Sequence, residues 1–239
     1  MKLDILIFAA HPDDAELGCS GTIVAHIAAC KKVGIVDLTR GELGTRGTPE
    51  TRAAEAKAAS EILGLSVRDN LDLADGFFVN DKVHQLKVVE KIRQYKPELV
   101  IMNAIHDRHP DHAKGSKLVS ESCFLSGLKM IETTGPDGEK QEAWRPKAVY
   151  HYIQDRYIKP DVIVDITPFW EKKLESIRAF KSQFYNPADS SENTYISSPE
   201  FMEFLEARAK EFGHAIGVTY GEGFTVERHI GVKNLFDLI

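Results

Sequence analysis

Two four-residue motifs contain most of the side chains in this sequence that can do chemistry. The first, HPDD at residues 11–14, directly follows the apolar run 3–10; the second, HPDH at residues 109–112, directly follows the apolar run 99–102. A buried strand that ends in such residues places them at the rim of an α/β sheet, where ligands bind. Zinc in hydrolytic sites is held by a few nitrogen and oxygen ligands and keeps a position open for water. The two motifs can supply such ligands and still leave a carboxylate and an imidazole for proton transfer.

In the first motif, His11 and Asp14 are three positions apart and can reach one ion, with Asp13 lying between them. The alternative is that Asp13 or Asp14 only caps the helix expected to follow. A histidine and two acids together at a strand end favour a functional site over capping.

In the second motif, His109 and His112 have the same spacing. The alternative here is a turn at Pro110 with Asp111 as the cap of the next helix. Because both motifs follow strands that end at the same rim, they reinforce each other. Together they predict a His-Asp-His metal site that leaves Asp13 and His109 free of the metal.

The elements that must position these motifs alternate along the first half of the chain. Apolar runs predict strands at 3–9, 33–38, 66–71 and 99–103, and helical spacing or capping signals predict helices at 15–29, 49–63, 81–95 and 111–126. This alternation is typical of a doubly wound, mostly parallel sheet flanked by helices. We therefore expect an α/β fold with a Rossmann-like core over 1–126.

The second half is less regular. Strands are expected at 148–153 and 161–166, with short ones at 217–220 and 223–227, and helices at 167–182 and 198–213. The Asn-, Ser- and Pro-rich stretch 186–197 predicts a mobile loop. Because the sequence shows no linker, we expect a single domain spanning 1–239, in which residues 127–239 complete the sheet and the site.

Bulk properties exclude several classes of function. The chain has 239 residues and a net charge of −6, and its longest basic runs are two lysines, which argues against nucleic acid as a partner. Three cysteines without a paired spacing indicate free thiols in a reducing compartment. No apolar run approaches the ~20 residues that span a bilayer. We expect a cytoplasmic protein without a membrane partner. The sequence is compatible with a homo-oligomer.

The paired motifs resemble those of the LmbE-like, or PIG-L, zinc-dependent de-N-acetylases, over the whole length of the chain. Segments 37–42, 107–109 and 182–184 resemble the branch that deacetylates N-acetylglucosaminyl malate in bacillithiol biosynthesis. The resemblance implies a zinc hydrolase that releases acetate from an N-acetylglucosamine conjugate. It implies one Zn²⁺ per chain, although Fe²⁺ suits the same ligands.

The resemblance also implies roles for the motif residues. His11, Asp14 and His112 would be the metal ligands, and Asp13 the general base that activates water. His109 would be the general acid or would stabilise the oxyanion, with Asp111 orienting it.

Substrate contacts follow from the charge of a malate conjugate. Arg52 and Arg108 are candidates for its carboxylates, since guanidinium groups bind carboxylates in a bidentate manner. The alternatives are a solvated Arg52 and an Arg108 that orients catalytic carboxylates. Glu42 binds a sugar hydroxyl or belongs to a polar turn, and Tyr195 either closes over the site or is an ordinary surface tyrosine.

Two rival functions remain at this stage. One is a related enzyme that acts on another conjugate, such as a chitooligosaccharide, an inositol glycoside or a thiol conjugate. The other is a zinc- or sugar-binding protein without catalysis, which the spare carboxylate of Asp13 argues against.

Overall fold

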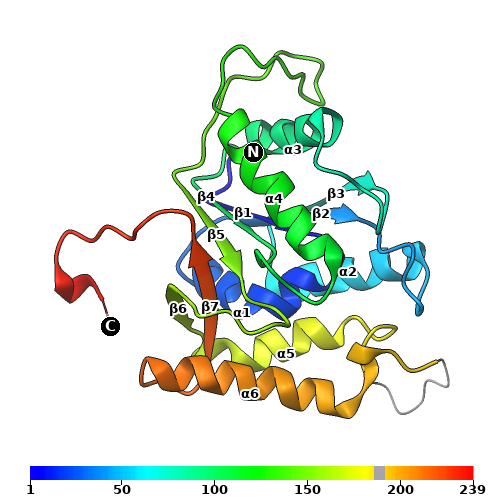
Figure 1. The fold of residues 1–239 in the computed structure, drawn as a ribbon, viewed down its shortest axis with the longest axis vertical. Helices are drawn as coiled ribbons and strands as arrows, with labels where there is room; N and C mark the ends of the chain where they lie inside the picture. Colours follow the sequence, from blue (N-terminus) through cyan, green and yellow to red (C-terminus); the bar gives the residue numbers. More distant parts are fainter. Residues whose placement is uncertain (186–191, 239) are drawn as a thin grey trace.

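A seven-stranded sheet runs through the centre of the computed structural model, which describes residues 1–185 and 192–238 (Figure 1). Its strands lie in the order β3-β2-β1-β4-β5-β7-β6. Strands β1 to β5 pair in parallel, and β7 is antiparallel to both of its neighbours. The strands are β1 Ile5–Ala9, β2 Val33–Thr39, β3 Val67–Leu73, β4 Leu99–Met102, β5 Ala148–Tyr152, β6 Val162–Asp165 and β7 Gly221–Val226.

Helices cover both faces of the sheet. They are α1 Asp14–Ala28, α2 Pro49–Leu63, α3 Lys82–Tyr95, α4 Pro110–Leu125, α5 Trp170–Arg178 and α6 Pro199–Ala215, with short 3₁₀ turns η1 Thr167–Phe169, η2 Tyr195–Ser197 and η3 Leu235–Asp237. The expected α/β class with a mostly parallel sheet is confirmed. No described helix is long and apolar enough to cross a membrane.

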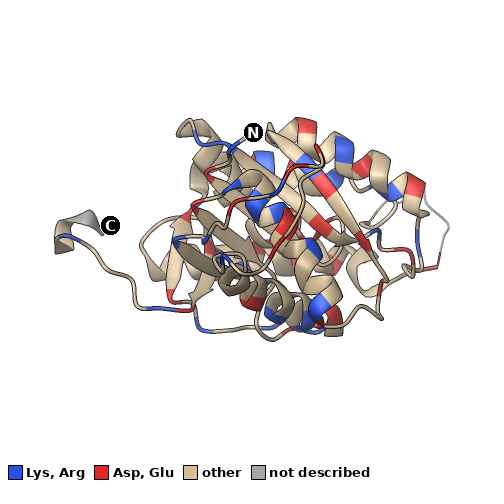
Figure 2. Cartoon of the chain, turned by 90° about the horizontal axis from the view of Figure 1, so that it is seen from above, with Lys and Arg blue, Asp and Glu red and all other residues tan. Residues whose placement is uncertain are grey.

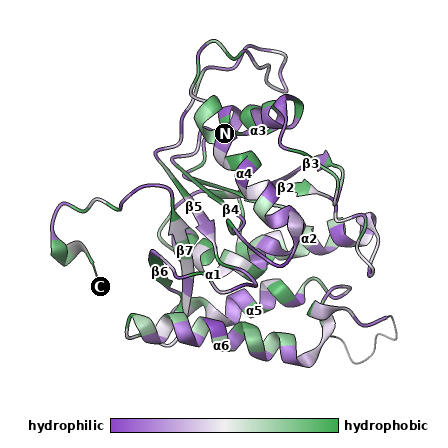
Figure 3. Ribbon diagram, in the orientation of Figure 1, coloured by the Kyte–Doolittle hydropathy of each residue, from purple (hydrophilic) through white to green (hydrophobic). Residues whose placement is uncertain are grey.

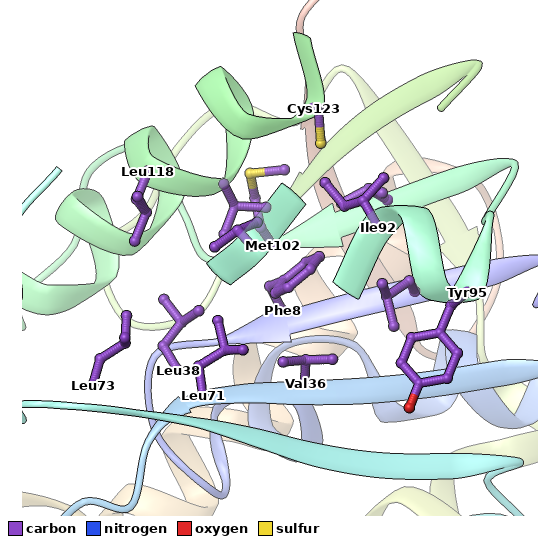
Figure 4. Close-up of a cluster of buried hydrophobic side chains, with 14 of the residues drawn as sticks. Phe8, Val36, Leu38, Leu71, Leu73, Ile92, Tyr95, Met102, Leu118 and Cys123 are labelled. Atoms are coloured by element: carbon purple, nitrogen blue, oxygen red, sulfur yellow. The ribbon is translucent and has the colours of Figure 1, made fainter. Parts of the chain in front are cut away.

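Two apolar layers hold the helices against the sheet. On one face, α3 and α4 pack on side chains such as Phe8 and Val36, as the close-up in Figure 4 shows. On the other face, α1 packs on Ile7 and Ile35. A third cluster joins α1 and α2 to α5 and α6, which form an outer layer below the sheet in Figure 1. Helix α1 lies very close to the sheet, since a Cβ at Gly18 would overlap the ring of Tyr152.

Local signals placed α2 correctly. The Thr48 hydroxyl accepts a hydrogen bond from the Thr51 backbone N–H, Pro49 occupies the first turn, and Gly64 ends the helix in the left-handed conformation with φ 78°.

Two predicted elements differ from the structure. Residues 217–220 form no strand, because Gly217 adopts φ 79° and the N–H of Val218 bonds back to the carbonyl of Gly213 at the end of α6. The helix expected over 167–182 begins as η1 and its α-helical part ends at Arg178. Beyond it, Phe180 turns inward to join the buried cluster. Within the predicted 186–197 loop, residues 186–191 lie outside the described part of the chain.

Helix α1 is broken in its middle, where Cys19 has the non-helical angles φ −149° and ψ 17°. A buried ion pair from the second half of the chain fills the break. Lys173 Nζ donates to the carbonyls of Glu16 (3.1 Å) and Leu17 (2.7 Å) and lies 2.7 Å from Glu222 Oε1. The Glu222 carboxylate in turn accepts hydrogen bonds from two backbone N–H groups that follow the break in α1.

Those two donors are the backbone N–H groups of Gly21 (2.9 Å) and Thr22 (2.7 Å). Since buried backbone groups without partners are costly, the Lys173–Glu222 pair is what allows α1 to bend over the sheet.

Replacing Lys173 with Met should destabilise the fold strongly, because it leaves the Glu222 carboxylate buried without its cation. Breaking a buried pair from one side costs about 3–5 kcal/mol. We expect the free energy of unfolding, measured by urea denaturation with far-UV circular dichroism, to fall by that amount.

The neighbouring Lys172 provides a matched control, since it is exposed and lies 3.6 Å from the exposed Glu175 carboxylate. Lys172→Met should change the free energy of unfolding by less than about 1 kcal/mol. Equal losses in the two variants would contradict the role assigned to Lys173.

Candidate active site

The sheet brings the two motifs together, because β1 and β4 are hydrogen-bonded neighbours with Ile5 paired to Leu99 and Ile7 to Ile101. The connection after β1 leads to α1 on one face, and the connection after β4 leads to α4 on the other. This is the switch point of a doubly wound sheet, where a crevice opens at the carboxyl ends of the strands.

Asp14 lies between the two predicted imidazole ligands. Its Oδ2 is 3.4 Å from His11 Nδ1, and its Oδ1 is 3.1 Å from His112 Nε2. Three further donors fix the carboxylate: the His11 backbone N–H (3.0 Å), Asn103 Nδ2 (3.1 Å) and Gln154 Nε2 (2.7 Å). Burial alone raises the pKa of Asp14, but the charge of His112 and hydrogen bonds from both rings hold it well below its usual range. Asp14 is therefore a carboxylate.

Two further carboxylates hold the outer nitrogens of these rings. His11 Nε2 lies 3.0 Å from Asp75 Oδ1, and His112 Nδ1 lies 2.6 Å from Asp107 Oδ2. When the outer nitrogens donate, the inner nitrogens present lone pairs toward Asp14. Carboxylate–histidine pairs of this kind orient metal-ligating imidazoles.

Sequence reasoning assigned no role to Asp75 or Asp107. Asp75 follows β3 and Asp107 follows β4, and Asn103 and Gln154, which bond Asp14, follow β4 and β5. The same signal that identified the motifs, polar residues just after a buried strand, also marks these four.

The arrangement fits a divalent cation. Five buried carboxylates surround the rings, those of Asp13, Asp14, Asp75, Asp107 and Asp111. Arg52 is paired with Asp13 and Lys114 with Asp111, which leaves three carboxylates facing the two imidazoles.

Without a metal, protons take the place of the cation. Burial lowers the pKa of His112, but Asp14 and Asp107 outweigh it and raise the pKa to about 9. Metal binding at such a site displaces protons.

The geometry also offers a second donor set. Nitrogens of His11, His109 and His112 lie within 4.8 Å of one another. However, His109 caps α4, and its Nδ1 accepts the backbone N–H of Asp111 (3.3 Å). Burial and the positive charges of His11 and His112 lower the pKa of His109. A neutral ring with Nδ1 engaged carries its proton on Nε2, as a hydrogen-bond donor.

The structure corrects the expected role of Asp111. Only its backbone N–H contacts His109. Its carboxylate accepts hydrogen bonds from the backbone N–H of Gly76 (2.7 Å) and from Lys114 Nζ (2.8 Å), and lies 3.5 Å from His11 Nε2. Asp111 therefore supports the outer side of His11 together with Asp75.

Asp13 does not act as a helix cap. Its side chain makes no capping hydrogen bond, and its backbone has φ 118°, a region that residues other than glycine seldom occupy. Burial raises the pKa of its carboxyl to about 7, although the Arg52 guanidinium opposes this shift. Strained backbone of this kind is concentrated at functional sites.

Arg52 is buried and already has partners on the protein. Its Nη2 lies 3.2 Å from Asp13 Oδ2 and donates to the carbonyl of Pro12, while Nη1 donates to the carbonyl of Gly41 (3.3 Å). Arg52 is therefore neither the solvated residue nor the partner of a substrate carboxylate that the sequence suggested. These contacts place Arg52 as a residue that positions Asp13.

The other substrate candidates lie at different depths. The Glu42 carboxylate accepts hydrogen bonds from the backbone N–H groups of Asp75 (2.9 Å) and Arg40 (3.2 Å). These contacts match the alternative in which Glu42 belongs to a polar turn. Arg108 is half-exposed, lies 3.6 Å from Asp155 Oδ2 and has its guanidinium 4.3 Å from the ring centroid of Tyr195. Tyr195 is itself exposed.

A cavity of about 130 Å³ joins the deep and the outer parts of the site. Its lining includes the three motif histidines and the two acids of the first motif, together with Arg52, Arg108, Gln154 and Gln183. Arg108 is therefore an arginine of this cavity that presents a charge toward solvent, while Arg52 is held by Asp13.

Comparison with known proteins places this site in a family. The family model for PIG-L, GlcNAc-PI de-N-acetylase, matches residues 6–123, which include both motifs. The conserved protein TT1542 from Thermus thermophilus is similar in structure, with a TM-score of 0.85 and 34% identity over 97% of this chain and 98% of that one.

Three relatives differ in the activity that their names describe. A diacetylchitobiose deacetylase of Thermococcus kodakarensis is 28% identical over 92% of this chain and 81% of its own length. A probable N-acetyl-alpha-D-glucosaminyl L-malate deacetylase of Bacillus anthracis is 27% identical over 84% and 91%. A 4-oxalmesaconate hydratase of Pseudomonas putida is 28% identical over 74% and 73%.

The metal content of the wild type and four variants should separate the two donor sets. We expect His112→Ala to lose most of its zinc after dialysis, as measured by plasma mass spectrometry, while Asp13→Asn and His109→Ala keep about one ion per chain, as the wild type does. Asp107→Asn should weaken zinc affinity roughly 10–100-fold, because it removes the partner that orients His112.

Loss of zinc from His109→Ala would move the assignment to the three-histidine set. Loss from Asp13→Asn would make Asp13 a ligand and leave the site without its proposed base.

Proposed function

The chain belongs to the PIG-L family of de-N-acetylases, and on that premise we propose that it removes the acetyl group from an N-acetylglucosamine conjugate. The preferred substrate in this proposal is N-acetylglucosaminyl malate, and the reaction is the deacetylation step of bacillithiol biosynthesis. Products would be acetate and the free amine of glucosaminyl malate. The observation that carries the proposal is the buried Asp13 carboxylate, which directly precedes Asp14 of the His11–Asp14–His112 cluster and is paired with Arg52.

The proposed roles follow from that geometry. A zinc ion held by His11, Asp14 and His112 would polarise the acetyl carbonyl and lower the pKa of water. Asp13 accepts a proton from the attacking water and is the group placed to return it to the leaving nitrogen. His109 donates a hydrogen bond from Nε2 to the developing oxyanion.

The charge of the outer site supports a substrate that carries carboxylates. The chain has a net charge of −6, so a dianion needs a local cation. Arg108 supplies one at the cavity, where Tyr195 covers one face of its guanidinium. This makes Arg108 the proposed partner of a malate carboxylate.

Acetate release from a panel of substrates tests the proposal. The panel contains N-acetylglucosaminyl malate, diacetylchitobiose, an N-acetylglucosaminyl inositol and N-acetylglucosamine, and zinc and iron are measured in the same sample. Asp13→Asn is the control, and its kcat should be ~10²–10⁴ lower. Because one relative is named a hydratase, a conjugated dicarboxylic acid is included and its ultraviolet absorbance followed. Water addition without acetate release would replace the deacetylase proposal.

Arg108→Ala should reduce preference for the malate conjugate. A charge-assisted hydrogen bond contributes ~1.5–3 kcal/mol, so kcat/KM for N-acetylglucosaminyl malate should fall roughly 10–100-fold. The slower reaction with N-acetylglucosamine should hardly change, since that sugar has no carboxylate. Equal losses on the two substrates would rule out Arg108 as the malate partner.

Arg52→Gln should lower kcat on both substrates and shift the pH profile. The base works in its ionised form, so activity falls as the pH drops below the pKa of Asp13. Arg52 opposes the rise of this pKa, and its loss should therefore move the acid limb of kcat/KM to higher pH. An unmoved acid limb would show that Arg52 does not act through Asp13.

A further inference from the structure

A buried histidine outside the two motifs links the elements that carry the proposed metal ligands. His151 lies on β5 and is 3% exposed. Its Nδ1 lies 2.8 Å from Ser116 Oγ and 3.2 Å from the backbone carbonyl oxygen of Asn103, and its Nε2 lies 3.0 Å from Glu227 Oε1. We name these four residues the His151 network. Figure 3 shows hydrophilic colour on β5, although this strand lies inside the sheet between β4 and β7.

Glu227 holds the outer side of the His151 ring. It follows β7, where the chain leaves the body of the fold, as Figures 1 and 2 show from two directions at right angles. The hydrogen bond from His151 lowers the pKa of the Glu227 carboxyl, and an ionised carboxylate can only accept hydrogen bonds. Nε2 therefore carries the hydrogen of this bond, and Nδ1 faces the interior.

On the inner side, Ser116 connects the ring to α4. Ser116 is 2% exposed and lies four positions after His112, so the two residues occupy adjacent turns on one face of this helix. The contact between Ser116 and His151 therefore fixes the turn next to the one that presents His112.

The backbone of Asn103 connects the ring to the other two proposed ligands. Asn103 follows β4 and is buried. Its Nδ2 donates to Asp14 Oδ2 (3.1 Å), and its Oδ1 accepts the backbone N–H of Ala10 (2.8 Å), the residue before His11. A displacement of the Asn103 backbone would therefore move both Asp14 and the start of the first motif.

We propose that His151 is a positioning residue for the metal centre and acts through other residues rather than by binding the metal. Its ring is bonded to the helix that carries one proposed ligand and, through Asn103, to the supports of the other two. A buried polar network whose members all have partners keeps a single arrangement, and metal ligands must be held close to their final geometry by the residues behind them. This proposal rests on the ligand set given under the proposed function.

Zinc affinity, measured by competition with a chromophoric chelator, tests the proposal without substrate turnover. In His151→Asn the side-chain amide reaches the position of Nδ1, whereas in His151→Gln it is one carbon further out and reaches the position of Nε2. We expect His151→Asn to bind zinc nearly as tightly as the wild type. His151→Gln and His151→Leu should bind it roughly 10-fold more weakly, the lower end of the loss caused by removing a group that is bonded directly to a ligand.

The matched control is His26→Leu, which should keep the zinc affinity of the wild type. His26 is also partly buried, and its Nδ1 lies 2.8 Å from the carbonyl oxygen of Thr22, but it belongs to the end of α1 that is remote from the first motif.

The free energy of unfolding of the metal-free variants, measured by urea denaturation, separates positioning from general stability. A network that only stabilises the fold would lower this free energy in His151→Leu and leave zinc affinity unchanged, and that result would overturn the proposal. Equal zinc affinities of His151→Asn and His151→Gln would also overturn it. This second comparison decides the question if His151→Leu does not fold.

His112→Ala, measured in the same assay, separates this proposal from the ligand assignment. If this variant keeps its zinc, the ligand set is wrong and the role of His151 falls with it. If His112→Ala loses zinc while the His151 variants bind it as the wild type does, only the positioning role is overturned.

Discussion

The buried pair of Lys173 and Glu222 is the interaction on which the site depends. It supplies the donors and acceptors that the break at Cys19 takes from α1. The first turns of that helix hold Asp14, and the residue before them is Asp13. A straight helix of the same length would direct its second half elsewhere. Helix α5 of the outer layer and strand β7 of the sheet, which carry Lys173 and Glu222, therefore fix the position of a motif that lies far from them in sequence.

The charges of the buried carboxylates explain why the few side chains proposed to react are surrounded by many polar partners. Each nitrogen of the His11 and His112 rings and each oxygen of Asp14 has a named partner. Some of these partners are in turn bonded to backbone groups, as Asp107 is to the N–H groups of Arg108 and Arg156. Carboxylates in a dry site repel one another unless cations or donors lie between them. The resulting network holds the side chains in place before substrate arrives, the condition that electrostatic catalysis requires.

Much of this arrangement follows from local sequence. The strands, the caps of α2 and the meeting of the two motifs were predictable because apolar runs, capping residues and strand ends act over short distances. The break in α1 was not, because its partners lie about 150–200 positions further on. Helical spacing placed Arg52 on α2 but could not show that Asp13 faces it. Asp111 was expected to orient His109, and its backbone N–H does contact that ring. The position of its carboxylate could not be predicted, because that group accepts the N–H of Gly76, which lies 35 positions away.

The backbone of Asp13 has a consequence for how this protein can evolve. A non-glycine residue at φ 118° carries a conformational cost of order 1–3 kcal/mol, a sizeable share of the 5–15 kcal/mol that usually separates folded from unfolded domains. Glycine at this position would relieve that cost and remove the carboxylate that we propose as the base. Selection for stability alone would therefore act against the acid, so its presence indicates a trade-off in which activity is retained at the expense of thermal robustness.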